Sequence, residues 1–204
     1  MPKSPTKRRP ATVAALTESA LTLFAERGFH ATSISDIVQR AGLTRGAFYS
    51  NFRDKEELFL ALYDAHTDRL LAEVRQQVES RTDDTDPVAR LFDLLATHDA
   101  QERSWFLVSM EFTLHAARHP EIARALAVHE ERLNTGLAEL LGHCLRSAGH
   151  TPDVSPTALA RLVVALYEGL TAMRVTHTTQ DTDPAPLARR ALPHLVRALS
   201  TPQD

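Results

Sequence analysis

Residues 33–52, SISDIVQRAGLTRGAFYSNF, decide the fold that we predict for this chain. Apolar residues recur in the first half with the spacing of one helical face, at Ile34, Ile37, Val38 and Ala41. Gly42 ends this helix, because glycine readily adopts the left-handed backbone that follows many helices. The Thr44 side chain can accept a hydrogen bond from an N–H group at the start of a second helix. The stretch predicts two short helices, 34–41 and 45–51, joined by a tight turn.

The second helix separates its aromatic residues from its small and basic residues. Phe48 and Phe52 lie one turn apart and face inward. The residues left on the other faces are Arg45, Gly46, Ala47, Tyr49 and Ser50. Because a helix with such a surface can enter the major groove of DNA, the stretch predicts a helix-turn-helix unit.

Three segments follow one another here: VAALTESALTLFAERGF at 13–29, ATSISDIVQRAGLTRGAFYSNF at 31–52 and RDKEEL at 53–58. In order and spacing they resemble the N-terminal domain of the TetR (tetracycline-repressor) family of bacterial transcription regulators. The resemblance implies an all-α fold, with an N-terminal three-helix DNA-binding domain and a C-terminal helical bundle for ligand binding and dimerisation. It also implies a homodimeric repressor that a small molecule releases from a palindromic operator. Ser50 and Asn51 depart from the family pattern, in which larger, often basic residues are common.

Four residues of the second helix are the candidates for reading base sequence. Arg45 can make a bidentate contact with guanine, worth ~1–3 kcal/mol of discrimination between bases. Gly46 allows a close approach of the backbone, Ala47 can touch a thymine methyl group, and Ser50 can bond more than one base. For Arg45 the alternative is an arginine that is solvated or binds phosphate.

Hydroxyl, amide and amino groups around the turn are the candidates for phosphate contacts: Thr32, Ser33, Ser35, Thr44, Tyr49, Asn51 and Lys55. The family resemblance points most strongly to Tyr49 and Lys55. Lys55 starts a long predicted helix, where the helix dipole favours an anion. For Ser33 and Thr44 the alternative is a role in helix capping alone.

The charge of the chain is uneven. Residues 1–55 contain nine Lys and Arg but four Asp and Glu, whereas the formal net charge of the whole chain is −3. A basic end on an acidic body suggests that this end faces phosphate, although such an excess is also common on ordinary protein surfaces. The chain has 43% hydrophobic and 24% charged residues, which is typical of a globular protein.

We expect three parts: a basic disordered arm over 1–10, a helix-turn-helix domain over 11–54 and a helical ligand-binding and dimerisation domain over 55–204. Helical periodicity predicts nine helices, at 11–27, 34–41, 45–51, 55–80, 87–97, 102–118, 120–148, 156–177 and 186–199. Pro193 lies inside the last of them and should kink or split it. Polar linkers are expected at 81–86 and 178–185.

The middle helices contain enough aromatic and methionine residues to line a cavity for a small apolar ligand. The candidate wall residues are Phe92, Trp105, Ser109, Met110, Phe112, His115, Tyr167, Leu170, Met173 and Arg174. A stripe of aromatic residues at helical spacing is, however, more often core than binding site.

The helix predicted at 156–177 is apolar around most of its circumference, so more than one of its faces must be buried. Through the family resemblance, the last two helices pair with their symmetry mates in a dimer. The candidate interface residues are Leu162, Leu166, Gly169, Leu187, Ala191, Leu195 and Leu199. The competing interpretation is the buried core of a monomer.

The sequence gives little support for a reactive cysteine, a metal site or a membrane segment. The chain has one cysteine, Cys144, expected to be a packed thiol in a reducing compartment. Glu111, His115 and His119 have a helical spacing that could bind zinc, with His98 possible as a further ligand, but we expect no metal and no cofactor. No apolar run is long enough to span a bilayer and no secretory signal is visible, which favours the cytoplasm.

The leading hypothesis is a ligand-responsive DNA-binding repressor. The alternative is a helical small-molecule-binding or scaffold protein without significant DNA binding. An enzyme is not expected, because the sequence contains no nucleophile elbow, phosphate loop or dinucleotide fingerprint.

Overall fold

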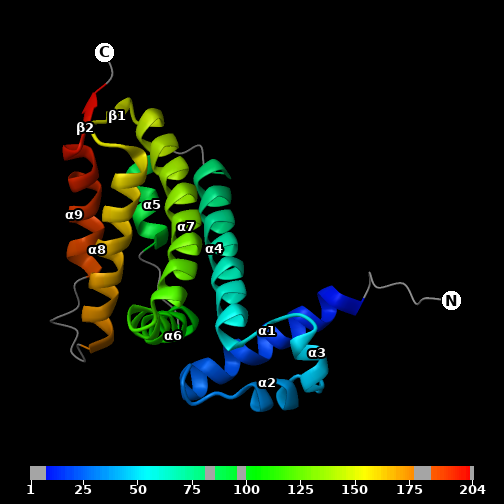
Figure 1. Cartoon of the computed structure of the whole chain (residues 1–204). Coiled ribbons are helices and arrows are strands. Elements are labelled where there is room, and N and C mark those ends of the chain that lie inside the picture. The colour runs from blue at the N-terminus through cyan, green and yellow to red at the C-terminus, as the bar shows by residue number, and fades with distance from the viewer. Residues whose placement is uncertain (1–7, 81–85, 96–99, 177–184, 203–204) are drawn as a thin grey trace. The chain divides into compact units, whose positions relative to one another are not determined.

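The computed structural model describes residues 8–80, 86–95, 100–176 and 185–202. Within these ranges the chain forms nine helices and one two-stranded ribbon (Figure 1). The helices are α1 (Arg8–Arg27), α2 (Ile34–Arg40), α3 (Arg45–Tyr49), α4 (Lys55–Ser80), α5 (Pro87–Leu95), α6 (Ala100–Ala117), α7 (Pro120–Ser147), α8 (Pro156–Thr176) and α9 (Ala185–Ala198). The strands are β1 (His150–Pro152) and β2 (Ser200–Pro202). The predicted all-α class and the helix order are confirmed.

One expectation about the start of a helix needs correction. Helix α1 begins at Arg8, so residues 8–10 belong to this helix and not to an arm; residues 1–7 lie outside the described part of the chain. Helix α9 continues through Pro193, which therefore does not split it. Of the predicted linkers, 81–85 and 178–184 also lie outside the described residues.

The chain divides into two compact units that do not follow the boundary expected at residue 55. Unit 1 comprises residues 1–66 and 104–129, and unit 2 comprises residues 67–103 and 130–204. Helices α4, α6 and α7 each contribute one part to either unit. No helix in the described ranges is long and apolar enough to cross a membrane.

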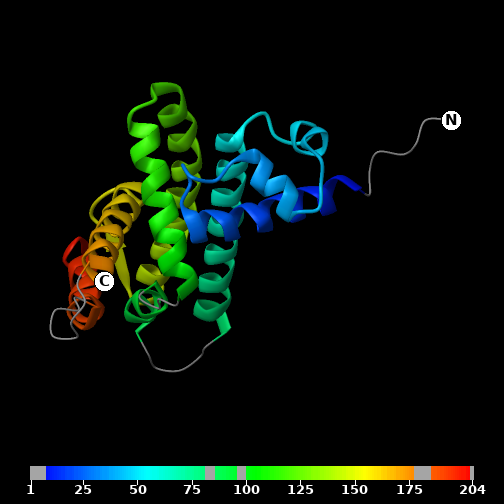
Figure 2. The same ribbon diagram turned by 90° about the horizontal axis from the view of Figure 1, so that it is seen from below.

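Unit 1 has an aromatic core that supports the short helices. In this unit α2 packs against both α1 and α3 (Figures 1 and 2). Phe112 of α6 stacks on Phe59 of α4 with ring centroids 4.0 Å apart, and its edge meets Phe29, just after α1, at 5.1 Å. Because the inner residues of α3, Phe48 and Phe52, belong to the same buried cluster, this core fixes which face of α3 remains outside.

Unit 2 has a mainly aliphatic core formed by α4, α5, α7, α8 and α9. Cys144 is buried in it, and burial raises the pKa of its thiol to about 11, so the thiol is a packed core group as expected. Strands β1 and β2 pair antiparallel, with Thr151 opposite Thr201. The periodicity of the sequence did not predict this ribbon, whose strands have only three residues each.

Candidate nucleic-acid interface

Helix α2 begins with a complete capping box. The Ser33 hydroxyl accepts a hydrogen bond from the Asp36 N–H, and the Asp36 carboxylate accepts one from the Ser33 N–H at 2.9 Å. The hydrogen bonds from Ser33 also lower the pKa of the Asp36 carboxyl below its ordinary value. These contacts set the residue at which α2 starts.

The turn between α2 and α3 has the geometry that the sequence predicts. Gly42 has a φ of +64°, in the region that disfavours residues with a side chain. The N–H of Leu43 donates to the carbonyl of Val38 at 2.8 Å, and the Thr44 hydroxyl accepts from the N–H of Ala47 at 3.1 Å. The turn therefore places α3 immediately after α2.

The outer surface of α3 carries all four predicted base-reading residues. Arg45, Gly46 and Ser50 are exposed, and Ala47 is half-buried. A Cβ atom added to Gly46 would meet only the Thr44 hydroxyl at 3.7 Å, an ordinary contact. The packing of this protein therefore does not require glycine at position 46. The Ser50 hydroxyl donates to the carbonyl of Gly46 at 2.7 Å, so it can only accept a hydrogen bond from a base.

Three of the predicted phosphate contacts lie on the same accessible surface. Tyr49 is 58% exposed, and its ring meets Phe48 edge to face. The Arg45 guanidinium donates to the Ser35 hydroxyl, whose own hydrogen remains available. The Thr44 hydroxyl accepts a backbone hydrogen bond, so it too can still donate to a phosphate oxygen.

Three others have polar groups that are bonded within the protein, which opposes a role in phosphate binding. Thr32 is buried, and its hydroxyl donates to the carbonyl of Gly28 at 2.9 Å. The Ser33 hydroxyl is used by the capping box, where it also donates to the Asp36 carboxylate. The Asn51 amide nitrogen donates to the carbonyl of Ala47 in α3 at 2.7 Å, and its side-chain oxygen is buried without a hydrogen-bond partner.

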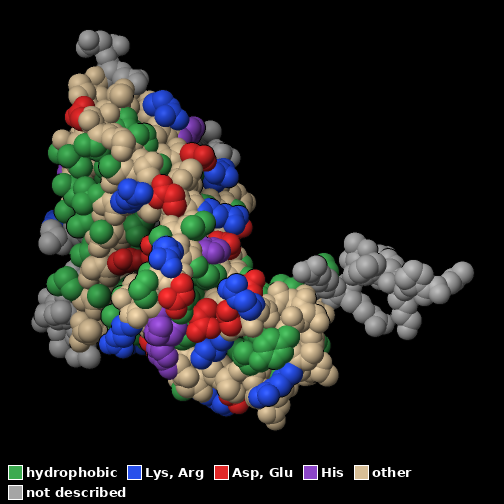
Figure 3. Space-filling view, in the orientation of Figure 1, with side chains coloured by type: hydrophobic (Ala, Val, Ile, Leu, Met, Phe, Trp, Pro, Cys, Tyr) green, Lys and Arg blue, Asp and Glu red, His purple; other side chains and the backbone are tan. Residues whose placement is uncertain are grey.

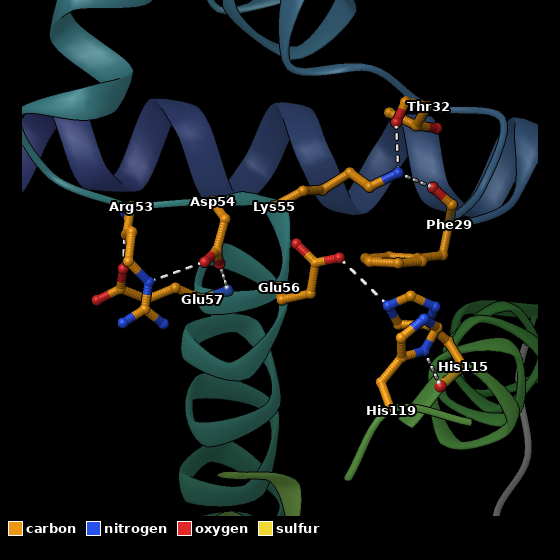
Figure 4. A network of polar contacts seen from close by, with 9 residues as sticks. All are labelled: Phe29, Thr32, Arg53, Asp54, Lys55, Glu56, Glu57, His115 and His119. Carbon is orange, nitrogen blue, oxygen red and sulfur yellow. Dashed lines mark hydrogen bonds and ion pairs between the residues drawn. The ribbon is translucent and has the colours of Figure 1, made fainter. Parts of the chain in front are cut away.

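Lys55 also forms its hydrogen bonds within unit 1. Its ammonium group donates to the carbonyls of Phe29 at 2.6 Å and Thr32 at 2.8 Å, and lies 4.3 Å from the centre of the Phe29 ring (Figure 4). Burial lowers the pKa of Lys55, against the opposing effect of the Glu56 charge. Two of its three donors are thus directed into unit 1 and not toward a phosphate.

Charged side chains of α4 and α6 make further contacts within unit 1. Glu56 of α4 approaches the Nε2 atom of His115 of α6 at 3.2 Å (Figure 4). Glu111, also of α6, accepts the N–H of Phe29 at 2.7 Å. From the sequence we assigned no role to Glu56, and we did not predict this contact of Glu111. No local pattern connects residues so far apart in the chain.

The ten candidate pocket residues do not form one set. Trp105, Ser109, Met110, Phe112 and His115 belong to unit 1, and Phe92, Tyr167, Leu170, Met173 and Arg174 belong to unit 2. Phe92 and Phe112 are core residues of their units. A hollow of about 160 Å³ on unit 2 is lined by residues outside the prediction: Arg75, Val78, Glu139, Leu140 and His143.

Hydrophobic side chains gather on the surface over α8 and α9 (Figure 3), and several candidate interface residues are exposed on these helices. Leu162 and Leu195 are each 39% exposed, and Gly169 and Ala191 are exposed as well. Leu166 and Leu199 are half-buried. The side chain of Leu187 lies outside the described residues.

A metal site has no support in the described part of the chain. No group of three or more His, Cys, Asp or Glu side chains there is arranged to hold an ion. The Nδ1 atom of His119 instead meets the carbonyl of His115 at 2.7 Å. His98 lies outside the described residues.

Two family models match the chain. The model described as "Bacterial regulatory proteins, tetR family" matches residues 16–62, which include α2 and α3. The model described as "BetI-type transcriptional repressor, C-terminal" matches residues 84–200, more than half of the chain.

Individual proteins agree with these matches. The HTH-type transcriptional activator FasR of Mycolicibacterium smegmatis is 30% identical over 127 residues, which are 60% of this chain and 55% of FasR. The HTH-type transcriptional regulator BetI of Pectobacterium carotovorum is 29% identical over 162 residues, 76% of this chain and 77% of BetI. The crystal structure of a TetR-family regulator from Rhodococcus sp. has a TM-score of 0.74 at 19% identity and covers 93% of this chain and 98% of its own. The chain belongs to the TetR family of bacterial regulatory proteins, which are DNA-binding transcription regulators and not enzymes.

Proposed function

We propose that the protein is a cytoplasmic homodimeric repressor that binds a palindromic operator through α3 of each subunit and leaves it when a small, mainly apolar molecule binds. The observation that carries the proposal is the outer face of α3. Four residues with little bulk or with hydrogen-bonding groups lie there together: Arg45, Gly46, Ala47 and Ser50. Because bulky aromatic residues occupy the opposite face, α3 has one surface that fits a major groove.

The roles of the surrounding residues follow from their accessibility. Arg45 reads a guanine, and Ser50 accepts from the amino group of a cytosine or adenine. Tyr49, Thr44 and Ser35 donate to phosphate oxygens and thereby set the register of the protein on the duplex. The small side chains at positions 46 and 47 permit the close approach that these contacts need.

The dimer rests on the apolar surface of α8 and α9. Leu162 and Leu195 are exposed on these two helices, although apolar side chains gain free energy when they leave water. A Cβ atom added to Gly169 would meet nothing within 4 Å. A second helix can therefore approach closely at this position. Two subunits paired through this surface would present two copies of α3.

The ligand site is proposed in unit 2, beside α8. Burial raises the pKa of the Tyr167 hydroxyl to about 12, with a further contribution from the Glu102 charge. The proposed site combines apolar surface with a few polar groups, as binding sites for small molecules do. Its residues are Tyr167, Leu170, Met173 and Arg174. The ligand must bind the operator-free arrangement more tightly, because equal affinity for both arrangements shifts nothing.

Selection of duplex DNA from a random pool tests the proposal. The intact protein should enrich sequences with two symmetric half-sites whose centres are about 10 base pairs, or a multiple of this, apart. The enriched duplex then serves as a probe in a screen for small apolar molecules that cause release. If no sequence is enriched even at low salt, the alternative of a helical binding or scaffold protein replaces the repressor.

A further inference from the structure

The peptide groups on either side of Phe29 are held by charged side chains of opposite sign. Its N–H donates to the carboxylate of Glu111 at 2.7 Å, and its carbonyl accepts from the ammonium group of Lys55 at 2.6 Å. Lys55 comes from the first turn of α4, and Glu111 from α6. Both contacts lie within unit 1.

Phe29 lies in the connection, residues 28–32, between α1 and α2. Gly28 ends α1 with a φ of +83°, and its N–H donates to the carbonyl of Phe24 at 2.8 Å. At the other end, Lys55 also holds the carbonyl of Thr32, directly before the Ser33 cap of α2. One ammonium group therefore joins the end of α1 to the start of α2 (Figure 4).

The connection is shaped to receive these two side chains. A Cβ atom at Gly28 would lie 2.7 Å from a carboxylate oxygen of Glu111, so the carboxylate occupies the space that a side chain would need. The Lys55 ammonium, partly removed from water, is compensated by two carbonyls and by the face of the Phe29 ring. Glu56, its neighbour in sequence, is engaged by His115.

We infer that Lys55 and Glu111 are positioning residues for operator binding, and that Lys55 does not contact DNA phosphate. They hold the connection 28–32 in the conformation that gives α2, and with it α3, the orientation required by the major groove. The inference rests on the proposed function, because it concerns the orientation of the same reading helix. It differs from the expectation that the family resemblance gave for Lys55.

Binding measurements separate positioning from phosphate contact. Lys55→Met retains the apolar stem of the side chain but removes the ammonium group, and Glu111→Leu removes the acceptor. Arg53→Met is the matched control, because Arg53 is a neighbouring cation whose side chain is 81% exposed. For each full-length variant, affinity is measured for the selected duplex and for a scrambled duplex between about 50 and 200 mM salt.

Each binding-competent Lys55→Met and Glu111→Leu variant should bind the selected duplex about tenfold more weakly, since the freed connection holds the binding orientation for only a fraction of the time. Affinity for the scrambled duplex and the salt slope should remain those of the wild type, so the ratio of specific to non-specific affinity falls. A protein that is merely destabilised shows a reduced active fraction with an unchanged ratio, and this contradicts the inference. Glu111→Gln, whose amide oxygen still accepts, should restore most of the affinity and guards against a failure of Glu111→Leu to fold.

Two further results would overturn the inference. If Lys55→Met weakens both duplexes equally and lowers the salt slope by about 1, Lys55 is a phosphate contact after all. If Lys55→Met and Glu111→Leu both keep the wild-type affinity for the selected and the scrambled duplex, the contacts of Lys55 and Glu111 with the connection 28–32 have no role in binding. Failure of the wild-type protein to bind any selected duplex refutes the proposed function itself and is thus distinguishable from both.

Discussion

The two compact units bury their apolar residues in different ways. The main core of unit 1 contains six phenylalanines, whereas the described core of unit 2 contains one and is otherwise aliphatic. In unit 1, polar side chains also form hydrogen bonds with backbone carbonyls, as Thr32 and Lys55 do. Unit 2 instead leaves large apolar side chains exposed on α8 and α9, among them Leu162, Met173 and Leu195.

This difference indicates that the core of unit 1 orients short helices, whereas the surface of unit 2 is suited to contact with a second subunit. Helices α2 and α3 have seven and five residues, too few to be stable alone, so a rigid core must supply their orientation. Unit 2 retains an apolar surface that a second subunit can cover. If the two units differ in this way, changes in the core of unit 1 should lower stability and changes on the surface of unit 2 should alter assembly.

The largest effect is expected from a cavity in the core of unit 1. Phe112→Ala removes a ring that is fully buried and stacked on Phe59, and should lower the free energy of unfolding by about 3–5 kcal/mol. Urea unfolding of the two proteins measures this difference. Leu114, 61% exposed on the same helix, provides the control, and Leu114→Ala should stay within about 0.5 kcal/mol of the wild type. Equal losses in both variants would mean that the aromatic core is not what stabilises unit 1.

The next effect concerns the apolar surface of unit 2. Leu195→Glu places a charge on α9 and should convert a dimer at micromolar concentration into monomers, as seen by sedimentation. Operator affinity should fall about 100-fold or more. In a dimer, binding of one α3 to its half-site raises the effective concentration of the second α3 at the other half-site. Leu114→Glu, an exposed position in unit 1, should leave the dimer intact. A wild-type protein that sediments as a monomer contradicts the proposed interface.

A smaller effect is expected at the reading helix. Arg45→Ala should relax base preference at one position of each half-site and cost about 1–3 kcal/mol there. Binding of both proteins to a library of operator variants measures the preference. Should affinity fall uniformly while every preference persists, Arg45 binds phosphate and not a base.

The smallest effect is a pH dependence within unit 1. Burial lowers the pKa of His115, aided by the charges of His119 and His30 and opposed by Glu56. Since the folded protein then binds fewer protons than the unfolded chain, stability is greatest above the ordinary pKa of about 6.5 and declines as the pH falls through the lower folded value.

Urea unfolding at several pH values between neutral and mildly acid tests this. His115→Gln should flatten the decline, whereas His143→Gln, at an exposed position of α7, should leave it unchanged. A decline that is identical in the wild type and His115→Gln would assign the effect to other groups.

Local signals in the sequence predicted the helix-turn-helix well. Helix α4 has the predicted bounds, and α2 and α3 end within two residues of them. The reason is that Ser33, Gly42 and Thr44 act on backbone groups within five residues of themselves, so the sequence alone contains the interaction.

Contacts between distant segments could not be predicted in the same way. The partners of Lys55 are carbonyls 26 and 23 residues away, and Glu111 meets an N–H 82 residues away. A lysine at the start of a helix looks the same in sequence whether it faces phosphate or the protein interior. The pairing of β1 with β2 was missed for a similar reason, because three-residue strands have no detectable alternation.

One measurement addresses the central claim, that the outer face of α3 contacts DNA. Gly46→Ala adds a single methyl group where the protein itself has room, and alanine should stabilise the helix by about 0.5–1 kcal/mol. Its affinity for the selected operator duplex is compared with that of the wild type. We expect no loss of stability together with operator binding about tenfold or more weaker, because the methyl group prevents close approach to the bases. Operator affinity equal to that of the wild type would mean that the outer face of α3 does not contact DNA.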